Sequence, residues 1–180
     1  MKLVGLDFET ANPGCGSICA AGVTVLNNGV AEETREWLIR PHRTLDWMLP
    51  EFTEIHKIGY FDLRNSPEFF EVWPAVKSLI EGGDYVVIHN AAFDLRHLDA
   101  VLNLYHLPSF SFKYVCSLRL CRKMFPQMNL YSLDAMAKHF CIEFQHHDAL
   151  EDAIACASIA AQTGIPENLI KTFEYQRLTE

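Results

Sequence analysis

The first predicted strand, Leu3–Thr10, ends in two acidic side chains and constrains the fold of the chain more than any other stretch. Its apolar residues come first, and Asp7 and Glu9 follow two positions apart. Because successive side chains of a strand point to opposite faces, Asp7 and Glu9 share one face and Phe8 occupies the other. Two neighbouring carboxylates repel each other unless a cation lies between them. Taken alone, the pair fits either a cation site or two exposed acids at the end of a strand.

Length and composition predict one globular domain with its own core. The chain has 180 residues, of which 49% are hydrophobic and 21% charged, a balance typical of folded chains. No apolar run approaches the roughly 20 residues that span a bilayer, and Asp7 comes too early for a signal peptide. We therefore expect a single domain over residues 1–180, with a core at about 2–163, a C-terminal helix at about 166–178, no membrane association and a cytoplasmic location.

The cysteines favour a reduced protein. The chain contains six of them: Cys15, Cys19, Cys116, Cys121, Cys141 and Cys156. An even number allows disulfides, but a domain of this size without a secretion signal does not need them, so we expect free thiols. The pairs Cys15/Cys19 and Cys116/Cys121 lack the spacing of a structural zinc site.

Turn residues and hydrophobic periodicity divide the rest of the chain into strands and helices. The turn Asn27-Asn28-Gly29 predicts a hairpin, so the first three strands form an antiparallel meander. The apolar run Tyr85–Ile88 is typical of a central strand buried on both faces. The predicted strands are 3–10, 17–26, 30–39, 85–88 and 110–115. The predicted helices are 66–81 with Ser66 as its N-cap, 93–105 with Phe93 facing inward, 117–125, 132–140, 148–163 and 166–178.

The segment 41–65 shows no clear periodicity and contains two prolines. A connection of this length inside a domain is usually functional. Its aromatic residues are Trp47, Phe52, Tyr60 and Phe61. They suit either a wall on which bases stack or a small apolar cluster of the segment itself, and the sequence leaves both interpretations open.

Three further polar residues lie beside predicted buried elements. Asp94 stands in the first turn of the helix after the 85–88 strand, and binding sites gather at such strand ends. Asp152 lies one turn into the helix 148–163, whose alanines permit close approach to the sheet, and His147 precedes it by five residues. Carboxylate oxygens suit Mg²⁺ or Mn²⁺, and a histidine can take a proton from water near neutral pH. Four carboxylates and a histidine therefore predict two-metal phosphodiester hydrolysis.

Three motifs resemble those of the DEDDh, or DnaQ-like, 3′–5′ exonucleases. They occur in family order as Asp7-Phe8-Glu9-Thr10, His89-Asn90-Ala91-Ala92-Phe93-Asp94 and His147-Asp148-Ala149-Leu150-Glu151-Asp152. Family-like features between them are Ile55-His56-Lys57-Ile58, Pro67-Glu68-Phe69 and Tyr131-Ser132-Leu133-Asp134. The likeness covers about residues 2–162. It implies an α/β, ribonuclease-H-like fold: a five-stranded mixed sheet, made of an antiparallel meander plus parallel strands, with helices on both faces.

The resemblance also implies how the acidic residues and the histidine act. The residues that would hold two divalent ions, Mg²⁺ or Mn²⁺, are Asp7, Glu9, Asp94 and Asp152. His147 would be the general base, because only His147 has the family spacing to Asp152. His146 fits either a supporting role or an exposed position.

Residues for the substrate follow from the same resemblance. Thr10 and Ala11 would meet the 3′-terminal nucleotide through their backbone amides, and His56 and Asn90 would line its pocket. Where relatives often have a glycine after the histidine, this chain has Lys57. A lysine there fits either a phosphate contact or a solvent-facing side chain.

The implied activity is release of nucleoside 5′-monophosphates from the 3′ end of single-stranded DNA or RNA, with DNA favoured. The net charge of −8 favours single-stranded ends or short oligonucleotides over long duplex. Arg119, Arg122 and Lys123 fit either a phosphate-binding patch or a solvated helix face. The alternatives are a catalytically inactive end-binding module and a polymerase accessory subunit with a proofreading role of the DNA polymerase III epsilon type. The sequence leaves a homodimer open.

Overall fold

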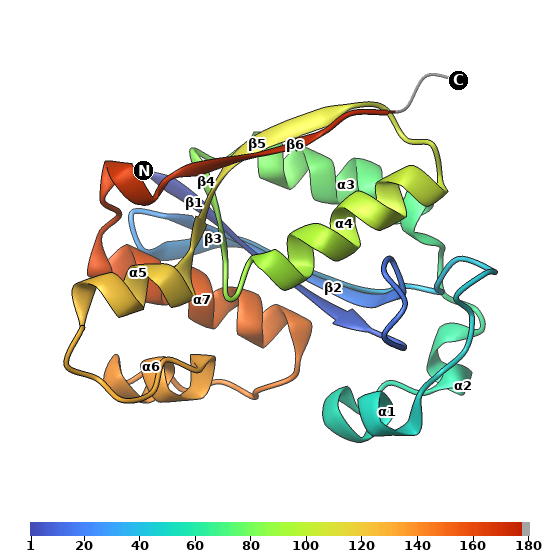
Figure 1. Ribbon diagram of the computed structural model, residues 1–180, viewed down its shortest axis with the longest axis horizontal. Coiled ribbons are helices and arrows are strands. Elements are labelled where there is room, and N and C mark those ends of the chain that lie inside the picture. The colour runs from blue at the N-terminus through green and yellow to red at the C-terminus, as the bar shows by residue number, and fades with distance from the viewer. Residues whose placement is uncertain (178–180) are drawn as a thin grey trace.

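A mixed sheet of six strands runs through the centre of the protein, and helices cover both of its faces (Figure 1). The computed structural model describes residues 1–177. The strands are β1 (Lys2–Thr10), β2 (Ile18–Asn27), β3 (Val30–Leu38), β4 (Tyr85–Ile88), β5 (Phe110–Cys116) and β6 (Lys171–Tyr175). The helices are α1 (Pro50–His56), α2 (Tyr60–Leu63), α3 (Phe69–Glu81), α4 (Ala92–Leu104), α5 (Ser117–Met124), α6 (Leu133–His139), α7 (Ala149–Thr163) and the 3-10 helix η1 (Glu167–Leu169).

The strands lie in the order β3-β2-β1-β4-β5-β6. The meander of β1, β2 and β3 is antiparallel, as the hairpin turn predicts, and β1, β4 and β5 run parallel. Gly5 pairs with Val87 across β1 and β4. The chain therefore leaves the short strand β4 beside the second half of β1, which delivers the start of α4 to the acidic end of β1.

Each face of the sheet has its own hydrophobic core. Helices α3 and α4 cover one face, where Val4, Leu6 and Phe8 of β1 pack. Helices α5, α6 and α7 cover the other face, where Leu3 of β1 and Val87 of β4 pack. The alternation along β1 sends Asp7 and Glu9 to the face that α7 covers. The side chains of Asp7 and Glu9 therefore point toward α7, whereas the body of α4 covers the opposite face of the sheet.

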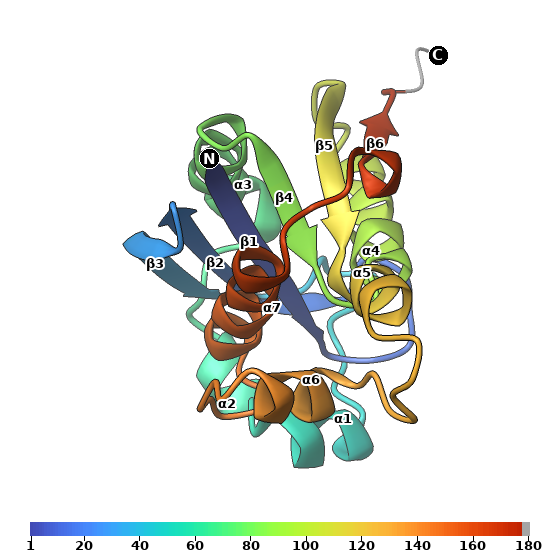
Figure 2. The ribbon, with the colours of Figure 1, turned by 90° about the vertical axis from the view of Figure 1, so that its left-hand side faces the viewer.

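Helix α7 lies directly against β1 and β2 (Figures 1 and 2). Two glycines make this approach possible. A Cβ at Gly5 would overlap the carbonyl oxygen of Ala153, and a Cβ at Gly22 would overlap that of Ala149. The alanines of α7 present no bulk of their own, as the sequence predicts. Because the helix backbone comes this close, the first turn of α7 reaches the strand that carries the acids.

The C-terminal helix predicted at about 166–178 is wrong within the described residues. The chain forms η1 there and then β6, which pairs antiparallel with β5 and makes the sheet six-stranded, where five strands were expected. Phe173 and Tyr175 are buried at 8% and 2% exposure, and the alternate residues of β6 are exposed. This period of two is that of a strand, and it outweighs the helix-start signal of Pro166. Residue 178 lies outside the described residues.

Helix α3 begins later than predicted. Its N-cap is Glu68, whose backbone N–H donates to the Glu71 carboxylate at 2.8 Å. The predicted cap, Ser66, is not part of the helix start, because the Pro67 carbonyl accepts a hydrogen bond of 2.8 Å from Arg40 N–H. This bridge holds the chain extended for two more residues before the helix can start.

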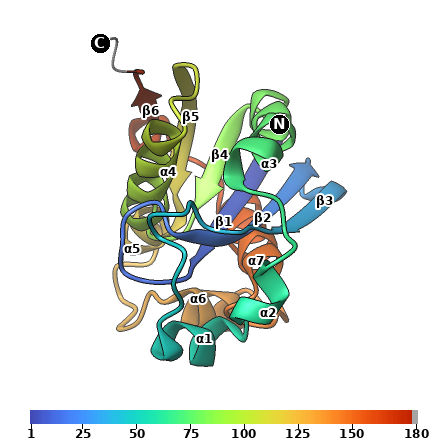
Figure 3. The ribbon, with the colours of Figure 1, turned by 90° about the vertical axis from the view of Figure 1, so that its right-hand side faces the viewer.

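The segment 41–65 folds into the two short helices α1 and α2 beyond the C-terminal end of β1 (Figures 1 and 3). Leu63 packs with Ala11 and Cys19 in a small apolar cluster. Tyr60 and Phe61 are exposed at 56% and 78%. The segment thus packs its apolar residues against Ala11 and Cys19, at the end of β1 and the start of β2, and Tyr60 and Phe61 lie outside that cluster.

All six cysteines are free thiols in the structure. Within residues 1–177, no helix combines the length and the apolar character that crossing a membrane requires.

Candidate active site

The four acidic residues singled out from the sequence converge at the end of β1. Carboxylate oxygens of Asp7, Glu9 and Asp152 lie within 4.8 Å of one another. Asp94, in the first turn of α4, accepts a hydrogen bond of 3.1 Å from the backbone N–H of Phe8. Since Phe8 lies between Asp7 and Glu9 in β1, this bond fixes Asp94 against the same part of the strand. Residues far apart in sequence therefore form one acidic cluster.

Burial and mutual repulsion make the acidic cluster hard to ionise. The pKa of Asp7 is raised well above its usual value by burial and then by the charges of Asp94 and Asp152. Burial and the same two neighbours raise the pKa of Glu9 to about 8. Burial also raises the pKa of Asp94 to about 8, against the opposing effect of the Phe8 hydrogen bond, and it raises the pKa of Asp152. Without bound positive charge, carboxyls of the acidic cluster therefore keep protons at pH values where exposed acids have lost them.

The donor set fits divalent cations. All four groups are carboxylates, the hard oxygen ligands that Mg²⁺ and Mn²⁺ prefer. Among residues 1–177, no lysine or arginine forms an ion pair with them. A cation bound between these oxygens would relieve the repulsion that raises their pKa values. The cluster is thus electrostatically incomplete without bound positive charge.

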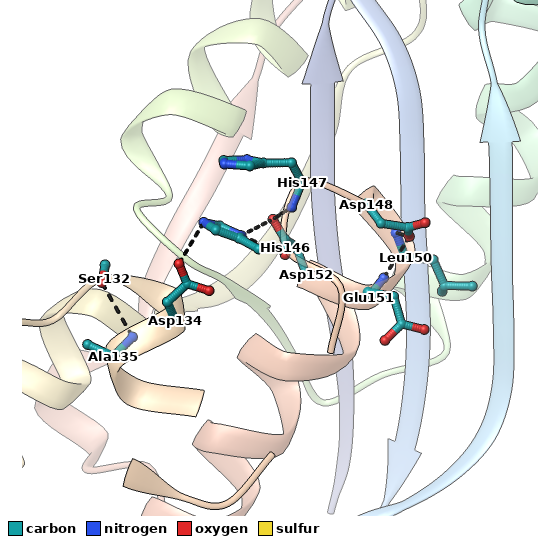
Figure 4. Close-up of polar contacts among 9 residues, drawn as sticks. All are labelled: Ser132, Asp134, Ala135, His146, His147, Asp148, Leu150, Glu151 and Asp152. Carbon is teal, nitrogen blue, oxygen red and sulfur yellow. Dashed lines mark hydrogen bonds and ion pairs between the residues drawn. The ribbon is translucent and has the colours of Figure 1, made fainter. Parts of the chain in front are cut away.

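Two consecutive histidines lie beside Asp152 (Figure 4). His146 Nδ1 lies 3.1 Å and 3.2 Å from the two carboxylate oxygens of Asp152, and its Nε2 lies 3.8 Å from Asp134. The backbone N–H of His147 donates to Asp152 at 3.4 Å. The two imidazole rings stack with their centroids 3.8 Å apart. Of the two predicted roles for His146, the structure favours support, because the ring contacts an acid of the cluster.

The ring of His147 is exposed, and its pKa is lowered, first by partial desolvation and then by His146. The residue adopts a left-handed backbone with φ of 66°. Helix α7 starts immediately after it, with the Asp148 carboxylate accepting from the N–H groups of Leu150 and Glu151, both at 3.1 Å. This cap fixes where the helix begins, so the five-residue spacing places His147 and Asp152 at the same edge of the site.

A cavity of about 590 Å³ opens over the acidic cluster. The predicted site residues that line it are Asp7, Glu9, Thr10, His56, Asn90, Asp94, His147 and Asp152. Ala11 does not line the cavity. It is fully buried, and its N–H donates to the Ser17 carbonyl at 2.8 Å. Its backbone amide is therefore already engaged within the protein.

His56 lines the cavity but uses both ring nitrogens within the protein. Its Nδ1 accepts from the Ile58 N–H at 3.1 Å, so Nε2 carries the proton and donates to the Thr10 carbonyl at 3.2 Å. These bonds tie α1 to the end of β1. Lys57 lies outside the cavity lining with φ of 64°, and its ammonium donates to the Glu54 carbonyl at 2.6 Å. Lys57 thus closes its own helix and does not face the cavity.

His89 marks the opposite side of the cavity, where β4 ends. Its Nδ1 lies 2.9 Å from the hydroxyl of Ser117 in α5, and burial lowers the pKa of His89 to about 4. The ring is therefore neutral near pH 7 and joins β4 to α5.

Several cavity residues were not anticipated. Phe93, predicted to face inward, is 36% exposed and lines the cavity. It precedes Asp94 in the first turn of α4, which opens onto the cavity. Tyr131 also lines the cavity, and its signal was its place in a family-like motif. Of the aromatic residues in segment 41–65, Phe52 lines the cavity and Trp47 does not.

The three cations of α5 have different surroundings. Arg122 lines the cavity. Lys123 donates a hydrogen bond of 2.8 Å to the side chain of Asn168. Arg119 is exposed and lies outside the cavity lining. They do not form one patch over the site.

Comparisons with known proteins agree with this geometry. Residues 4–160 match a family model described as an exonuclease, of the RNase T type. The DNA polymerase III subunit epsilon of Escherichia coli (strain K12) is 32% identical over 172 residues, which cover 91% of this chain and 67% of that subunit. A solved structure of exonuclease X in complex with 5′ overhanging duplex DNA has a TM-score of 0.71 and 26% identity, covering 89% of this chain and 90% of that one.

A second solved structure, the nuclease domain of 3′hExo, a DEDDh family member bound to rAMP, has a TM-score of 0.76 at 18% identity and covers 89% of this chain and 90% of its own. At this identity the likeness concerns the fold. Together with the family model and the epsilon subunit, these matches assign the family. The chain belongs to the DEDDh, DnaQ-like family of 3′–5′ exonucleases.

Proposed function

We propose that this exonuclease works with two divalent ions, Mg²⁺ or Mn²⁺, held by Asp7, Glu9, Asp94 and Asp152. The observation that carries the proposal is that carboxylate oxygens from β1 and α7 lie within 4.8 Å of one another on the wall of a cavity. Their raised pKa values are the mark of a site that bound positive charge stabilises. When bound, the ions would lower the pKa of a water ligand and stabilise charge on the attacking and leaving oxygens.

His147 acts as the general base in this proposal. Its ring lies at the cavity, and its lowered pKa leaves the imidazole neutral near pH 7 and free to accept a proton from water. His146 positions Asp152 through the contact at 3.1 Å. Removal of either ring should therefore lower activity, but only His147 should set how the rate depends on pH.

Thr10, Asn90 and His56 form the pocket for the 3′-terminal nucleotide. All three line the cavity, Thr10 from the end of β1, His56 from the end of α1 and Asn90 from the connection between β4 and α4. His56 contributes the face of its ring, since both of its nitrogens are engaged. Ala11 is left out of the proposed pocket because its N–H is bonded to Ser17.

We propose single-stranded 3′ ends as the substrate, with DNA favoured over RNA and nucleoside 5′-monophosphates as the product. The net charge of −8 disfavours tight binding of long duplex. Two relatives support the preference for DNA. The epsilon subunit is named as part of DNA polymerase III, and exonuclease X was solved in complex with DNA. Likeness to the epsilon subunit also supports association with a DNA polymerase. The six free thiols suit a reducing compartment, so we propose the cytoplasm.

The test is degradation of a 5′-labelled single strand of DNA or RNA, with Mg²⁺, with Mn²⁺ and with a chelator. We expect stepwise shortening from the 3′ end that the chelator abolishes. His147→Ala should lower kcat by about 10²–10⁴-fold, and Asp7→Asn should abolish activity, whereas Glu54→Gln, at an exposed acid of α1, should match the wild type.

Full activity of Asp7→Asn would contradict the assigned roles. Binding of 3′ ends without shortening would instead identify an inactive end-binding module. Co-purification with a DNA polymerase tests that association, and light scattering of the same preparation shows whether the chain forms a homodimer.

A further inference from the structure

Arg122 differs from the other cations of α5 in facing the cavity. Among the lining residues that the structure describes, it is the only lysine or arginine. The remaining charged groups of the lining are the four carboxylates and the titratable histidines. A polyanionic substrate must therefore enter a cavity whose fixed charge is negative except at this one guanidinium.

The guanidinium of Arg122 rests on an aromatic ring, not on an acid. Its central carbon lies 5.9 Å from the ring centroid of Tyr131. The Tyr131 hydroxyl donates to the Phe125 carbonyl at 2.7 Å, which fixes the ring. Within residues 1–177, Arg122 forms no ion pair with a carboxylate. A guanidinium held over a ring keeps its N–H donors free at its edge, in the fork that matches phosphate oxygens.

The absence of an ion pair also shows that Arg122 stands apart from the acidic cluster. An arginine that took part in the acidic cluster would pair with its carboxylates, of which Asp7, Glu9 and Asp152 have oxygens within 4.8 Å of one another. Arg122 instead enters the lining from α5, beside Tyr131, whereas His56 enters it from α1, which lies apart from α5 (Figures 1 and 2). A strand with its terminal nucleotide against α1 would pass its preceding backbone toward α5.

We propose that Arg122 binds the phosphate of the linkage next to the scissile one, and that Tyr131 positions it. This inference rests on the proposed function. Arg122 would favour a strand of at least two linkages over a nucleotide ester with a single phosphodiester. It would act on substrate affinity and placement, and removal of its side chain would leave the acidic cluster unchanged.

The test compares two single-stranded DNA oligonucleotides that differ in one linkage. One is fully phosphodiester, and the other carries a neutral methylphosphonate at the linkage next to the terminal one. The measured quantity is kcat/KM for release of the first nucleotide. The variants are Arg122→Gln, Arg122→Lys and, as a matched control on the same helix, Arg119→Gln. A nitrophenyl ester of a nucleoside 5′-monophosphate, which has a single phosphodiester, is the third substrate.

We expect the methylphosphonate to lower kcat/KM of the wild type and of Arg119→Gln by about 10-fold or more, the range of a charge-assisted hydrogen bond. Arg122→Gln should already have a lower kcat/KM than the wild type on the phosphodiester strand, and the methylphosphonate should lower its kcat/KM little further. Arg122→Lys should lie between the wild type and Arg122→Gln. Hydrolysis of the nitrophenyl ester should be the same in all four proteins.

Two results would overturn the inference. In one, the methylphosphonate lowers the kcat/KM of Arg122→Gln as much as that of the wild type, which would mean that the arginine does not contact that phosphate. In the other, Arg122→Gln loses activity on the nitrophenyl ester, which would place the arginine at the scissile phosphate. A folded wild type that cleaves none of the three substrates with Mg²⁺ or Mn²⁺ would refute the proposed function itself, and with it this inference.

Discussion

Removing one acid of the cluster should stabilise the metal-free protein, and Glu9→Gln is the most informative change. The pKa of Glu9 rises from 4.5 to about 8 on folding, first through burial and then through Asp152 and Asp94. Between these two pH values the folded chain holds a proton that the unfolded chain has released. Stability therefore falls as the pH rises through this range, because the unfolded state binds fewer protons.

The size of the effect follows from that difference in pKa. At 1.36 kcal/mol for each pKa unit, ionising Glu9 at about pH 8 costs the metal-free fold up to about 4 kcal/mol. Glutamine keeps the shape and removes the charge, but its buried amide still loses hydration, which costs about 1–3 kcal/mol. We therefore expect a net gain of about 1–3 kcal/mol in the free energy of unfolding near pH 8. Near pH 5 the ionisation cost is below about 1 kcal/mol, so we expect no gain, or a loss of up to about 2 kcal/mol.

Urea unfolding in the presence of a chelator measures this gain. Glu54→Gln, at an exposed position of α1, is the matched control and should show no gain at either pH. Adding Mg²⁺ should reverse the order, since the wild type gains stability from the ion and Glu9→Gln gains less. If Glu9→Gln unfolds more easily than the wild type near pH 8 without metal, Glu9 supports the fold and the reasoning from repulsion is wrong.

Two further changes test the elements that build the site. Gly22→Ala should lower both stability and activity, because its Cβ would overlap the Ala149 carbonyl and push α7 from the sheet. Thermal unfolding and kcat measure the two effects. A variant with unchanged stability and activity would show that close packing of α7 is not required. Lys57→Gly should raise the free energy of unfolding by up to about 1 kcal/mol, since the left-handed backbone at φ of 64° strains any residue with a Cβ. Urea unfolding measures this gain. A loss of stability would mean that the hydrogen bond from the Lys57 ammonium to the Glu54 carbonyl outweighs the strain.

The acidic cluster was predictable because each acid stands at a locally recognisable position. Asp7 and Glu9 follow an apolar strand, Asp94 follows a buried one, and Asp152 lies in a helix rich in alanine. Parallel pairing of β1 with β4 brings Asp94 to the acidic end of β1, and the close approach of α7 to the sheet brings Asp152 there as well. The hairpin of β2 and β3 was predictable from local sequence as well, since the two-residue turn between them joins strands that pair antiparallel.

The last strand shows where local reasoning fails. Strand β6 is an edge strand that pairs with β5, more than fifty residues earlier in the chain. Its alternation of Phe173 and Tyr175 with exposed residues is a valid strand signal, but it covers only five residues and follows a proline that suits a helix start. A short edge strand is decided by its partner, and the partner is not visible in the local sequence.

The wall of the cavity shows the same limit at the level of single side chains. Arg119, Arg122 and Lys123 lie three and four residues apart, so a helix places them on neighbouring positions of one side. Tyr131, in the connection that follows α5, holds one of them, and Asn168, from a distant segment, holds another. Helical spacing can identify a basic face, but it cannot tell which cation of that face enters a cavity.

The two histidines give a local explanation for what spacing alone could not decide. On extended backbone, consecutive side chains point to opposite faces, so only one of His146 and His147 would approach Asp152. The left-handed conformation of His147, with φ of 66°, breaks this alternation and lets the two rings stack with their centroids 3.8 Å apart. One ring then contacts Asp152 while the other lies at the mouth of the cavity. The left-handed turn at His147 is therefore part of what assembles the site, since it brings both rings to the same edge.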